Sequence, residues 1–505
     1  MATLVPLIFY TLPYVVAVLL ALAVVGVGGV TVGRPWLIVL PFLAALFWLT
    51  ETRFGRLDLG GGPTLLTRGA GVLLFPAFLW GMLVALIWVR FGGMFRRGAA
   101  PLRMMSVTPW FAAWSVLLMA HVVVAAVSGI PLRNALSPTG FSYVAWIWVW
   151  MALMVAAVGR PDDARRLALF IMLMAVCRAA FGLVRFAAFG GDPSNAYANN
   201  QGLSLRLTFF DINDSLLCCL SVVMGLLMLF RAPPKSGWRN WQKAMLWVAV
   251  VLPAVCIVLS FRRTAWTGFV LAMSFLLLQL PARLRWKFIV TAVPILLAGI
   301  AYAAWKRLSQ VRGPSTGFFY DLTSRAVGAE SLRVLELKLA WQSFVHAPLF
   351  GVGSWGGYTG WEAISWQHEY GEGGGGTYLH SGVLHLALKS GLIGLVLLAG
   401  TAIAFVLAWR RLRHTLPAHA LPLAVAGVAG VLFMMPDWLI GTPISQLRTM
   451  MMLGLCMSLP FVAERSFSGA AARADAEADV GLAGGPRHWG SRRPRLAAAA
   501  PLAAR

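Results

Sequence analysis

The sequence predicts an all-α, polytopic membrane protein, a bundle of about 12–13 transmembrane helices. Of its 505 residues, 59% are hydrophobic and only 12% are charged, which is about half the charged fraction of an ordinary soluble domain. Apolar runs near the length that crosses a bilayer recur from Val5 to Val462. Runs of this length also exclude an outer-membrane barrel, whose strands are short and alternate in polarity.

The apolar segments follow one another along most of the chain. They lie near residues 8–31, 36–50, 70–89, 109–128, 141–158, 167–189, 212–230, 244–260, 264–280, 288–305, 381–408, 418–436 and 438–462. Each is long enough for a helix that is mostly buried in lipid or protein. The succession therefore predicts a helical bundle.

Connectors rich in Lys and Arg set the predicted orientation. The five clearest clusters lie at 96–103, 160–166, 235–243, 283–287 and 410–413. Cytoplasmic loops carry an excess of these residues, and placing all five clusters there gives one consistent alternation of helices. Segments 190–211, 260–264, 306–380 and 437–445 then face the other side. With 13 spans the amino terminus lies outside, and a re-entrant or interfacial early segment would reduce the count to 12.

This alternation divides the chain into four regions. Residues 1–305 form the amino-terminal transmembrane helices, 306–380 a long exterior loop, and 381–463 the carboxyl-terminal transmembrane helices. Residues 464–505 are rich in Ala, Gly and Arg without apolar periodicity, which predicts a disordered cytoplasmic tail. The net charge of +24 falls largely in the basic connectors and this tail, so we expect membrane lipid around the protein and no nucleic-acid partner.

The exterior loop 306–380 is the only extramembrane segment long enough to build a site. It holds six of the 18 acidic residues and three histidines. Residues 329–346 mix apolar and charged positions near helical spacing, which predicts an amphipathic helix on the membrane surface. Glycine-rich runs at 351–360 and 371–376 predict a mobile flap or a close backbone approach to a ligand. A floppy connector is the alternative for 371–376.

Several arginines lie on the exterior side, against the positive-inside trend. Arg262 and Arg263 begin a span and form a candidate anion site. Arg178 and Arg185 are seven residues apart in one span, so they share a helical face. Because a charge in mid-membrane costs about 2.5–3.5 kcal/mol, such residues are expected to face a polar cavity. The alternative is ion pairing within the bundle, with Asp211 or Asp214 as partners.

Other chemistries find no support in the sequence. The stretch around His368 is not an H-E-x-x-H motif, and His380 and His385 are five residues apart, which does not present both to one metal ion. Walker A and G-x-S-x-G motifs are also missing from the sequence. We therefore expect neither a metal ion nor a cofactor, and neither a pump nor a GTPase.

Three motifs in order resemble the O-antigen ligase/polymerase superfamily. They are LSFRRTAWTGFVLAM at 259–273, SLRVLELKLAWQSFVHAPLFGVGSWGGY at 331–358 and LHSGVLHLALKSGLIGLVLL at 379–398. The segment RLTFFDIND at 206–214 also resembles the family's R-x-x-G-x-F-x-x-P-N pattern, but Asp211-Ile212 replaces its proline region and Asp214 lies near its asparagine. The resemblance covers roughly residues 200–400.

The resemblance implies a GT-C-like glycosyltransferase of the bacterial inner membrane, with its active site facing the periplasm. Its donor would be an undecaprenyl-diphosphate-linked glycan, without a nucleotide sugar or a required metal. Its acceptor would be lipid A–core in a ligase, or a further repeat unit in an O-antigen or exopolysaccharide polymerase. Protein O-oligosaccharyl transfer belongs to the same superfamily. A transporter of lipid-linked saccharides is the competing class, and a nonenzymatic export scaffold ranks last.

The residues suit this chemistry. Histidine changes charge near neutral pH, so His380, where the exterior loop meets the next span, is the candidate general base that deprotonates the acceptor hydroxyl. Capping or packing is its alternative role. Arginine keeps its charge at any relevant pH, and Arg262 or Arg263 would stabilise the departing diphosphate together with Arg206 and Arg333. Further residues that could line the cavity or touch the acceptor are Arg178, Arg185, His346 and His368.

Overall fold

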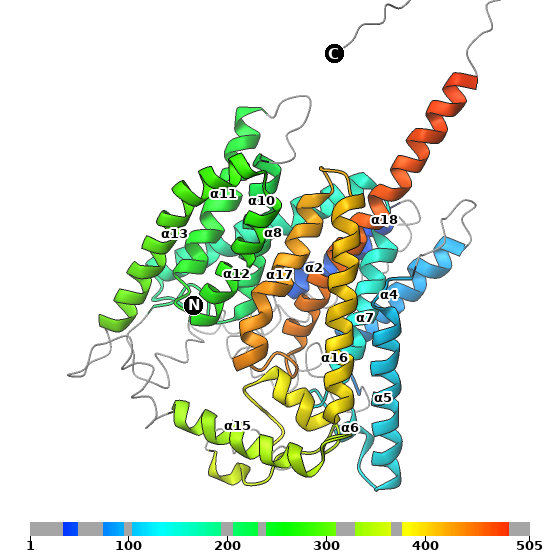
Figure 1. The fold of residues 1–505 in the computed structure, drawn as a ribbon, viewed down its shortest axis with the longest axis vertical. Helices are drawn as coiled ribbons and strands as arrows, with labels where there is room; N and C mark the ends of the chain where they lie inside the picture. Colours follow the sequence, from blue (N-terminus) through cyan, green and yellow to red (C-terminus); the bar gives the residue numbers. More distant parts are fainter. Residues whose placement is uncertain are drawn as a thin grey trace, which may run out of the picture.

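The computed structural model describes seven stretches of the chain. They are residues 34–48, 74–94, 104–192, 206–230, 239–309, 329–364 and 376–483. Within these stretches the chain forms helices and connecting turns, and no β-strand (Figure 1). The first predicted apolar segment, 8–31, lies outside them.

Every predicted apolar segment from 36–50 onward contains a helix. In chain order these helices are η1 (Pro35–Ile38), α2 (Val39–Trp48), α4 (Ala77–Met94), α5 (Thr108–Val127), α7 (Ser142–Ala157), α8 (Pro161–Ala188), α10 (Ile212–Phe230), α11 (Asn240–Val258), α12 (Arg263–Gln279), α13 (Ala282–Ser309), α16 (Gly382–Thr415), α17 (Leu421–Ile440) and α18 (Leu447–Ala483). Three further short or peripheral helices are α6 (Leu132–Ala135), α15 (Ala329–His346) and η4 (Trp361–Ala363).

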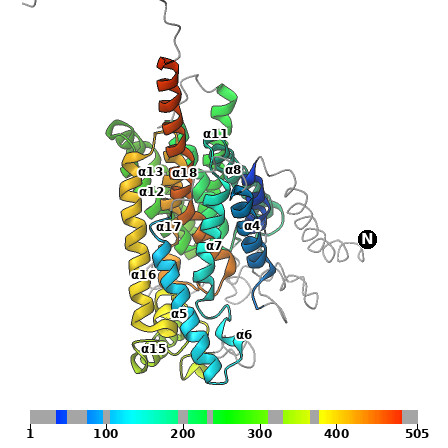
Figure 2. The same cartoon turned by 90° about the vertical axis from the view of Figure 1, so that its right-hand side faces the viewer.

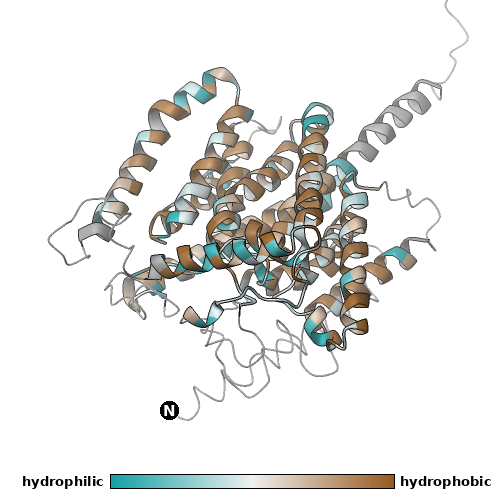
Figure 3. Ribbon diagram, turned by 60° about the horizontal axis from the view of Figure 1, so that its bottom comes forward, coloured by the Kyte–Doolittle hydropathy of each residue, from teal (hydrophilic) through white to brown (hydrophobic). Residues whose placement is uncertain are grey.

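The predicted all-α, polytopic membrane bundle is confirmed. Seven helices of the described part are long and apolar enough to cross a membrane, namely α5, α8, α10, α11, α16, α17 and α18. In Figure 3, which brings the bottom of Figure 1 forward, the bundle helices are mainly apolar. The total of 12–13 spans stays a prediction.

Helix α10 forms the centre of the bundle. Its residues 212–227 are buried without a break, and it packs against α8, α11, α12 and α17. Helices such as α5 and α11 instead expose large apolar side chains, including Val116, Val123 and Val251. A helix that is apolar all round suits a bundle centre, whereas the outer helices present the surface that lipid would cover.

Helix α15 lies across one end of the bundle, at the bottom of Figures 1 and 2. Its bounds are those of the predicted amphipathic segment 329–346. The helix is apolar on two faces, however. Ala340 and Phe344 are buried toward the protein, whereas Val334 and Trp341 are exposed. The face that packs on α16 therefore includes part of the apolar pattern that we expected to contact the membrane.

Two predicted boundaries differ from the helix ends. Helix α13 continues to Ser309, and α18 continues to Ala483, past the predicted start of a disordered tail at residue 464. Residues 469–483 are rich in alanine and contain no proline, and alanine has the highest helix propensity. The absence of apolar periodicity thus does not prevent helix formation. The rest of the predicted tail lies outside the described residues.

Close packing of α12 on α17 gives the first prediction. A Cβ atom on Gly268 would lie 2.1 Å from the carbonyl oxygen of Phe433, whereas one on Gly299 would meet Val258 at 3.7 Å, an ordinary contact. Gly268→Ala should therefore destabilise the protein by about 1–3 kcal/mol through overpacking, and Gly299→Ala should not. Thermal melting in detergent measures both variants, and equal melting temperatures would contradict this packing.

Candidate functional site

The candidate site lies at the end of the bundle crossed by α15. Here α8, α11 and α17 end and α10, α12, α16 and α18 begin, and their connecting segments contact one another. For example, Thr208 donates its backbone N–H to the carbonyl of Leu259 at 3.1 Å. We call this region the α15 end.

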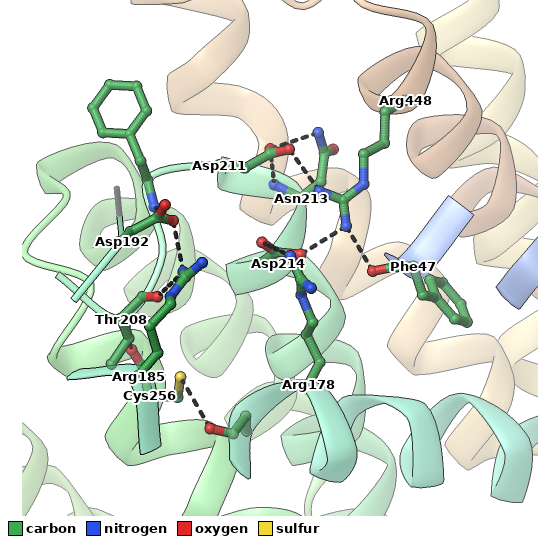
Figure 4. A network of polar contacts seen from close by, with 12 residues as sticks. Phe47, Arg178, Arg185, Asp192, Thr208, Asp211, Asn213, Asp214, Cys256 and Arg448 are labelled. Carbon is green, nitrogen blue, oxygen red and sulfur yellow. Dashed lines mark hydrogen bonds and ion pairs between the residues drawn. The ribbon is translucent and has the colours of Figure 1, made fainter. Parts of the chain in front are cut away.

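A buried network of charged side chains occupies the α15 end (Figure 4). The carboxylate of Asp214 on α10 accepts two hydrogen bonds from Arg178 of α8, at 3.0 and 2.9 Å. The same carboxylate accepts a 2.6 Å hydrogen bond from Arg448 of α18. Arg448 also donates to Asp211 at 2.6 Å. Two guanidinium groups and two carboxylates thus balance each other inside the bundle.

Arg448 extends the network to a fourth helix. Its guanidinium donates to the carbonyl oxygens of Leu46 and Phe47, near the end of α2, at 2.8 and 2.9 Å. The last carbonyls of a helix have no partners within that helix, so Arg448 satisfies groups that would otherwise lie buried and unpaired. The network therefore ties together α2, α8, α10 and α18.

Arg185 holds the segment that precedes α10. It pairs with Asp192 at 2.8 Å and donates to the carbonyl of Thr208 at 2.5 Å. The ring of Phe209 lies between two guanidinium groups, 5.2 Å from Arg178 and 5.5 Å from Arg185. Both arginines are buried, and each has an acidic partner.

Arg262, unlike the buried Arg178 and Arg185, is partly exposed. Its side chain is 17% exposed, it donates to the carbonyl of Phe210, and its guanidinium lies 5.1 Å from the centre of the Phe210 ring. Its nearest acidic contact is the carboxylate of Asp437, at 3.8 Å. Asp437 is thus the acidic partner of Arg262. The two aspartates that the sequence suggested as partners are engaged elsewhere: Asp211 binds Arg448, and Asp214 binds both Arg448 and Arg178.

A strained turn presents Arg262. The preceding residue, Phe261, is buried and has a φ of 52°, which is uncommon for a bulky residue. Such a conformation costs on the order of 1–3 kcal/mol and persists where the surroundings enforce it. Ser260 supports the turn through a 2.7 Å hydrogen bond to the carbonyl of Ile257. The turn ends α11 and begins α12 with Arg262 as its N-cap.

His380 contacts a buried carboxylate on α15. Its Nδ1 lies 2.9 Å from Oε2 of Glu336, and its backbone N–H donates to the same oxygen at 3.2 Å. Glu336 is fully buried, whereas the His380 side chain is 17% exposed. The ring of Tyr378 meets the imidazole edge to face at 5.2 Å. The imidazole is thus held on one side by a carboxylate.

The two partly exposed groups, His380 and Arg262, belong to one region. Asp437, at the end of α17, lies within electrostatic range of both and of Asp211. This carboxylate connects the His380 region with Arg262 and with the buried network. An imidazole that can accept a proton and a guanidinium that can bind an anion therefore lie at the same end of the bundle.

A chain of hydrogen bonds also connects the His380 region with the buried network. It runs from Tyr378 to Thr442 at 2.9 Å, from Gln446 to Thr442 at 3.1 Å, and between Thr449 and Gln446 at 2.9 Å. Asn213 completes it by donating to Thr449 at 2.9 Å and to Asp211 at 2.8 Å.

The glycine-rich run 351–360 docks into a break in α16. Gly391 has φ 66° and interrupts the helix, and Leu392 then donates its N–H to the carbonyl of Pro348 at 2.7 Å. A Cβ on Gly351, itself at φ 72°, would lie 2.4 Å from the carbonyl of Leu388. The buried Lys389 donates to the carbonyl of Gly356. The backbone of this run thus approaches α16 closely, and the predicted approach to a ligand stays a prediction. Residues 371–375 lie outside the described part.

The other predicted site residues are spread over this end. Arg206 is exposed, and Arg263 on α12 and Arg333 on α15 are half-buried. His346 is exposed and hydrogen-bonds the carbonyl of Gln342 in its own helix at 2.7 Å. His368 lies outside the described residues. Among those described, no group of three or more His, Cys, Asp or Glu side chains is placed to hold a metal ion.

Four charged residues at this end were not predicted from the sequence as members of the site or of its polar contacts. They are Glu336, Lys389, Asp437 and Arg448. Three of them, Lys389, Asp437 and Arg448, lie within predicted apolar segments or at their ends. The rule that a charged residue in a membrane helix marks a polar site could have found these three. Glu336 had no such signal, because a glutamate on a surface helix is normally solvated.

A comparison with known protein families gives a match that covers the site region. A sequence model of the family described as O-Antigen ligase matches residues 248–399, a range that contains Arg262, Glu336 and His380. The predicted resemblance to the O-antigen ligase-like superfamily is thereby confirmed. The match supports a membrane glycosyltransferase of the O-antigen ligase/polymerase superfamily. No curated protein matches the chain.

The buried network predicts a large difference between two aspartates. Asp214→Asn leaves Arg178 and Arg448 short of a buried negative charge, which should cost about 3–5 kcal/mol. Asp162→Asn is the control, because Asp162 pairs with Arg165 at 3.5 Å with both side chains more than half exposed, and such pairs contribute about 0–1 kcal/mol. Thermal melting of the purified full chain compares them. A melting temperature for Asp214→Asn that matches Asp162→Asn would contradict the role of the network.

Proposed function

We propose that this protein is an inverting glycosyltransferase of the bacterial inner membrane, of the O-antigen ligase type. It transfers a glycan from undecaprenyl diphosphate to a hydroxyl group of lipid A–core at the periplasmic face. The observation that carries the proposal is that an imidazole and a guanidinium, both partly exposed, lie together at the α15 end. His380 and Arg262 are each 17% exposed, and Asp437 lies within electrostatic range of both.

The donor supplies a leaving group that needs cations. A departing diphosphate carries several negative charges, and a guanidinium binds phosphate oxygens through paired hydrogen bonds. Arg262 is the first candidate, because its contact with Asp437 at 3.8 Å is longer than the contacts within the buried network. Arg206, Arg263 and Arg333 are further candidates at the same end. The buried Arg178 and Arg185 would then support the site as framework.

The acceptor supplies a hydroxyl group that needs a base. In the proposed reaction, His380 takes the hydroxyl proton as the acceptor oxygen attacks the anomeric carbon. The new C–O bond forms on the face opposite to the diphosphate, and the bond from the anomeric carbon to the diphosphate oxygen breaks. The electron pair leaves with the diphosphate, whose charge Arg262 stabilises. A single displacement of this kind inverts the anomeric configuration.

A repeat-unit polymerase of the same superfamily is the alternative within this chemistry. Both enzymes use the same donor and differ in the acceptor, for which residues 306–380 would form the pocket. Glycolipids from a deletion strain distinguish them. Loss of long glycan from lipid A–core indicates a ligase, and single repeat units on that core indicate a polymerase. A lipid-linked saccharide transporter would leave donor and acceptor unjoined in a purified system.

The proposal predicts the effects of substitutions at two positions, His380 and Arg262. His380→Ala should lower the transfer rate about 10²–10⁴-fold through loss of the base, and Arg262→Ala should lower it at least as strongly as Arg262→Lys, which keeps the charge. His346→Ala is the control, because His346 is an exposed histidine that bonds within its own helix. Transfer is measured with purified variants, using lipid-linked glycan extracted from cells that lack the protein. Wild-type rates for His380→Ala would overturn the base assignment.

A further inference from the structure

We infer that Glu336 is the positioning residue of the proposed base. Its carboxylate holds the imidazole of His380 with the proton on Nδ1, which leaves Nε2 as the nitrogen that accepts the proton of the acceptor hydroxyl. This inference rests on the proposed function of His380. It adds a further residue of α15, in addition to Arg333, to the proposed site.

The geometry fixes both the ring and its main chain. One oxygen of Glu336, Oε2, lies 2.9 Å from Nδ1 of His380 and 3.2 Å from its backbone nitrogen. An ionised carboxylate can only accept hydrogen bonds. A neutral His380 must therefore carry its proton on Nδ1 to make this contact, and its Nε2 then bears a lone pair. In the transfer step the hydroxyl proton moves to Nε2, and Glu336 continues to accept the hydrogen bond from Nδ1–H.

Burial separates Glu336 from Glu362, the other glutamate of the exterior loop whose side chain the structure describes, which is exposed. Glu336 is fully buried, beside a small apolar cluster that contains Ala340, Tyr358, Leu379 and Leu388. A carboxylate in such surroundings is costly unless it is paired and hydrogen-bonded. The hydroxyl of Tyr358 approaches its second oxygen at 3.5 Å. The carboxyl group of Glu336 thus lies beside apolar side chains and accepts hydrogen bonds from His380 and Tyr358.

The surrounding segment holds Glu336 in place. Thr359 donates its backbone N–H to the hydroxyl of Ser343 on α15 at 3.1 Å, and Tyr358 donates its own N–H to the carbonyl of Gly376 at 3.1 Å. Lys389 of α16 donates to the carbonyl of Gly356. The run 351–360 therefore joins α15 to α16, the two helices whose relative position sets the contact between Glu336 and His380.

A purely structural role would have different consequences. The backbone N–H of His380 lies just before α16, and Glu336 could serve only to brace this helix start. Two substitutions separate the roles. Glu336→Gln keeps an oxygen that can accept both hydrogen bonds but removes the charge. Glu336→Leu removes the acceptor and keeps a similar volume in an apolar cluster. Glu362→Gln, at an exposed position of η4, is the control for the loss of a glutamate nearby.

The first readout is the protonation of the His380 ring. Full-length protein with ¹⁵N-labelled histidine in lipid nanodiscs gives imidazole signals for its eight histidines, and a His380→Asn sample identifies those of His380. We expect the proton on Nδ1 in the wild type and in Glu336→Gln, and a mixture of both tautomers in Glu336→Leu. This measurement does not depend on any transfer activity.

The second readout is the rate of glycan transfer. We expect kcat to fall about 10-fold in Glu336→Gln and about 100-fold in Glu336→Leu, neither more than the roughly 10²–10⁴-fold that a general base contributes, with the acceptor KM changed less than about twofold. Wild-type kcat in both variants would overturn the inference, as would a His380 proton on Nε2 in the wild type. If the wild type transfers no glycan at all, the proposed function fails, and the NMR result still decides whether Glu336 sets the tautomer.

Discussion

The carboxylate of Asp214 is shared by two buried guanidinium groups, and the arrangement of the α15 end depends on this sharing. Arg178 approaches from α8 and Arg448 from α18, and α10 carries the carboxylate through the centre of the bundle. A buried charge without a partner is far more costly than a buried pair. The helices are therefore constrained to bring these groups together, and their connecting segments meet as a consequence.

The candidate site is built on this framework. Asp211, which binds Arg448, also lies within electrostatic range of Asp437, and Asp437 contacts Arg262. The buried Arg178, Arg185 and Arg448 each contact a carboxylate within 3.0 Å, whereas Arg262 is partly exposed and lies 3.8 Å from its carboxylate. This division of roles explains why one end of an apolar bundle can hold several arginines. Some of them hold the helices together, and Arg262 is the one proposed to bind an anion.

The fold could be predicted from the sequence largely because its signals are local. Apolar length located the helices, and the pattern over 329–346 gave the bounds of α15. The topology and the motifs proposed His380 and the arginines expected on the exterior side as candidate site residues. Their partners could not be identified in this way, because ion pairing depends on contacts between distant segments. Arg448 and Asp211, for example, are 237 residues apart in the sequence.

Glu336 shows the same limit within a single helix. Helix α15 has apolar residues on two faces, so its sequence alone does not decide which face is buried. The break of α16 at Gly391 was equally hidden, because the stretch 381–408 is mainly apolar and a single glycine is tolerated within a helical pattern. These two features place the carboxylate against His380. The buried face of α15 and the break of α16 both depend on tertiary contacts, because they form where the exterior segment packs on α16.

The central claim is that the α15 end catalyses a single displacement at an anomeric carbon. The most direct test is the anomeric configuration of the linkage that the purified protein makes, read by NMR from coupling constants in donor and product. The proposal predicts that the configuration of the donor linkage to diphosphate is inverted in the product. Retention of that configuration would contradict a single displacement, and no joined product from purified components would contradict an enzymatic role.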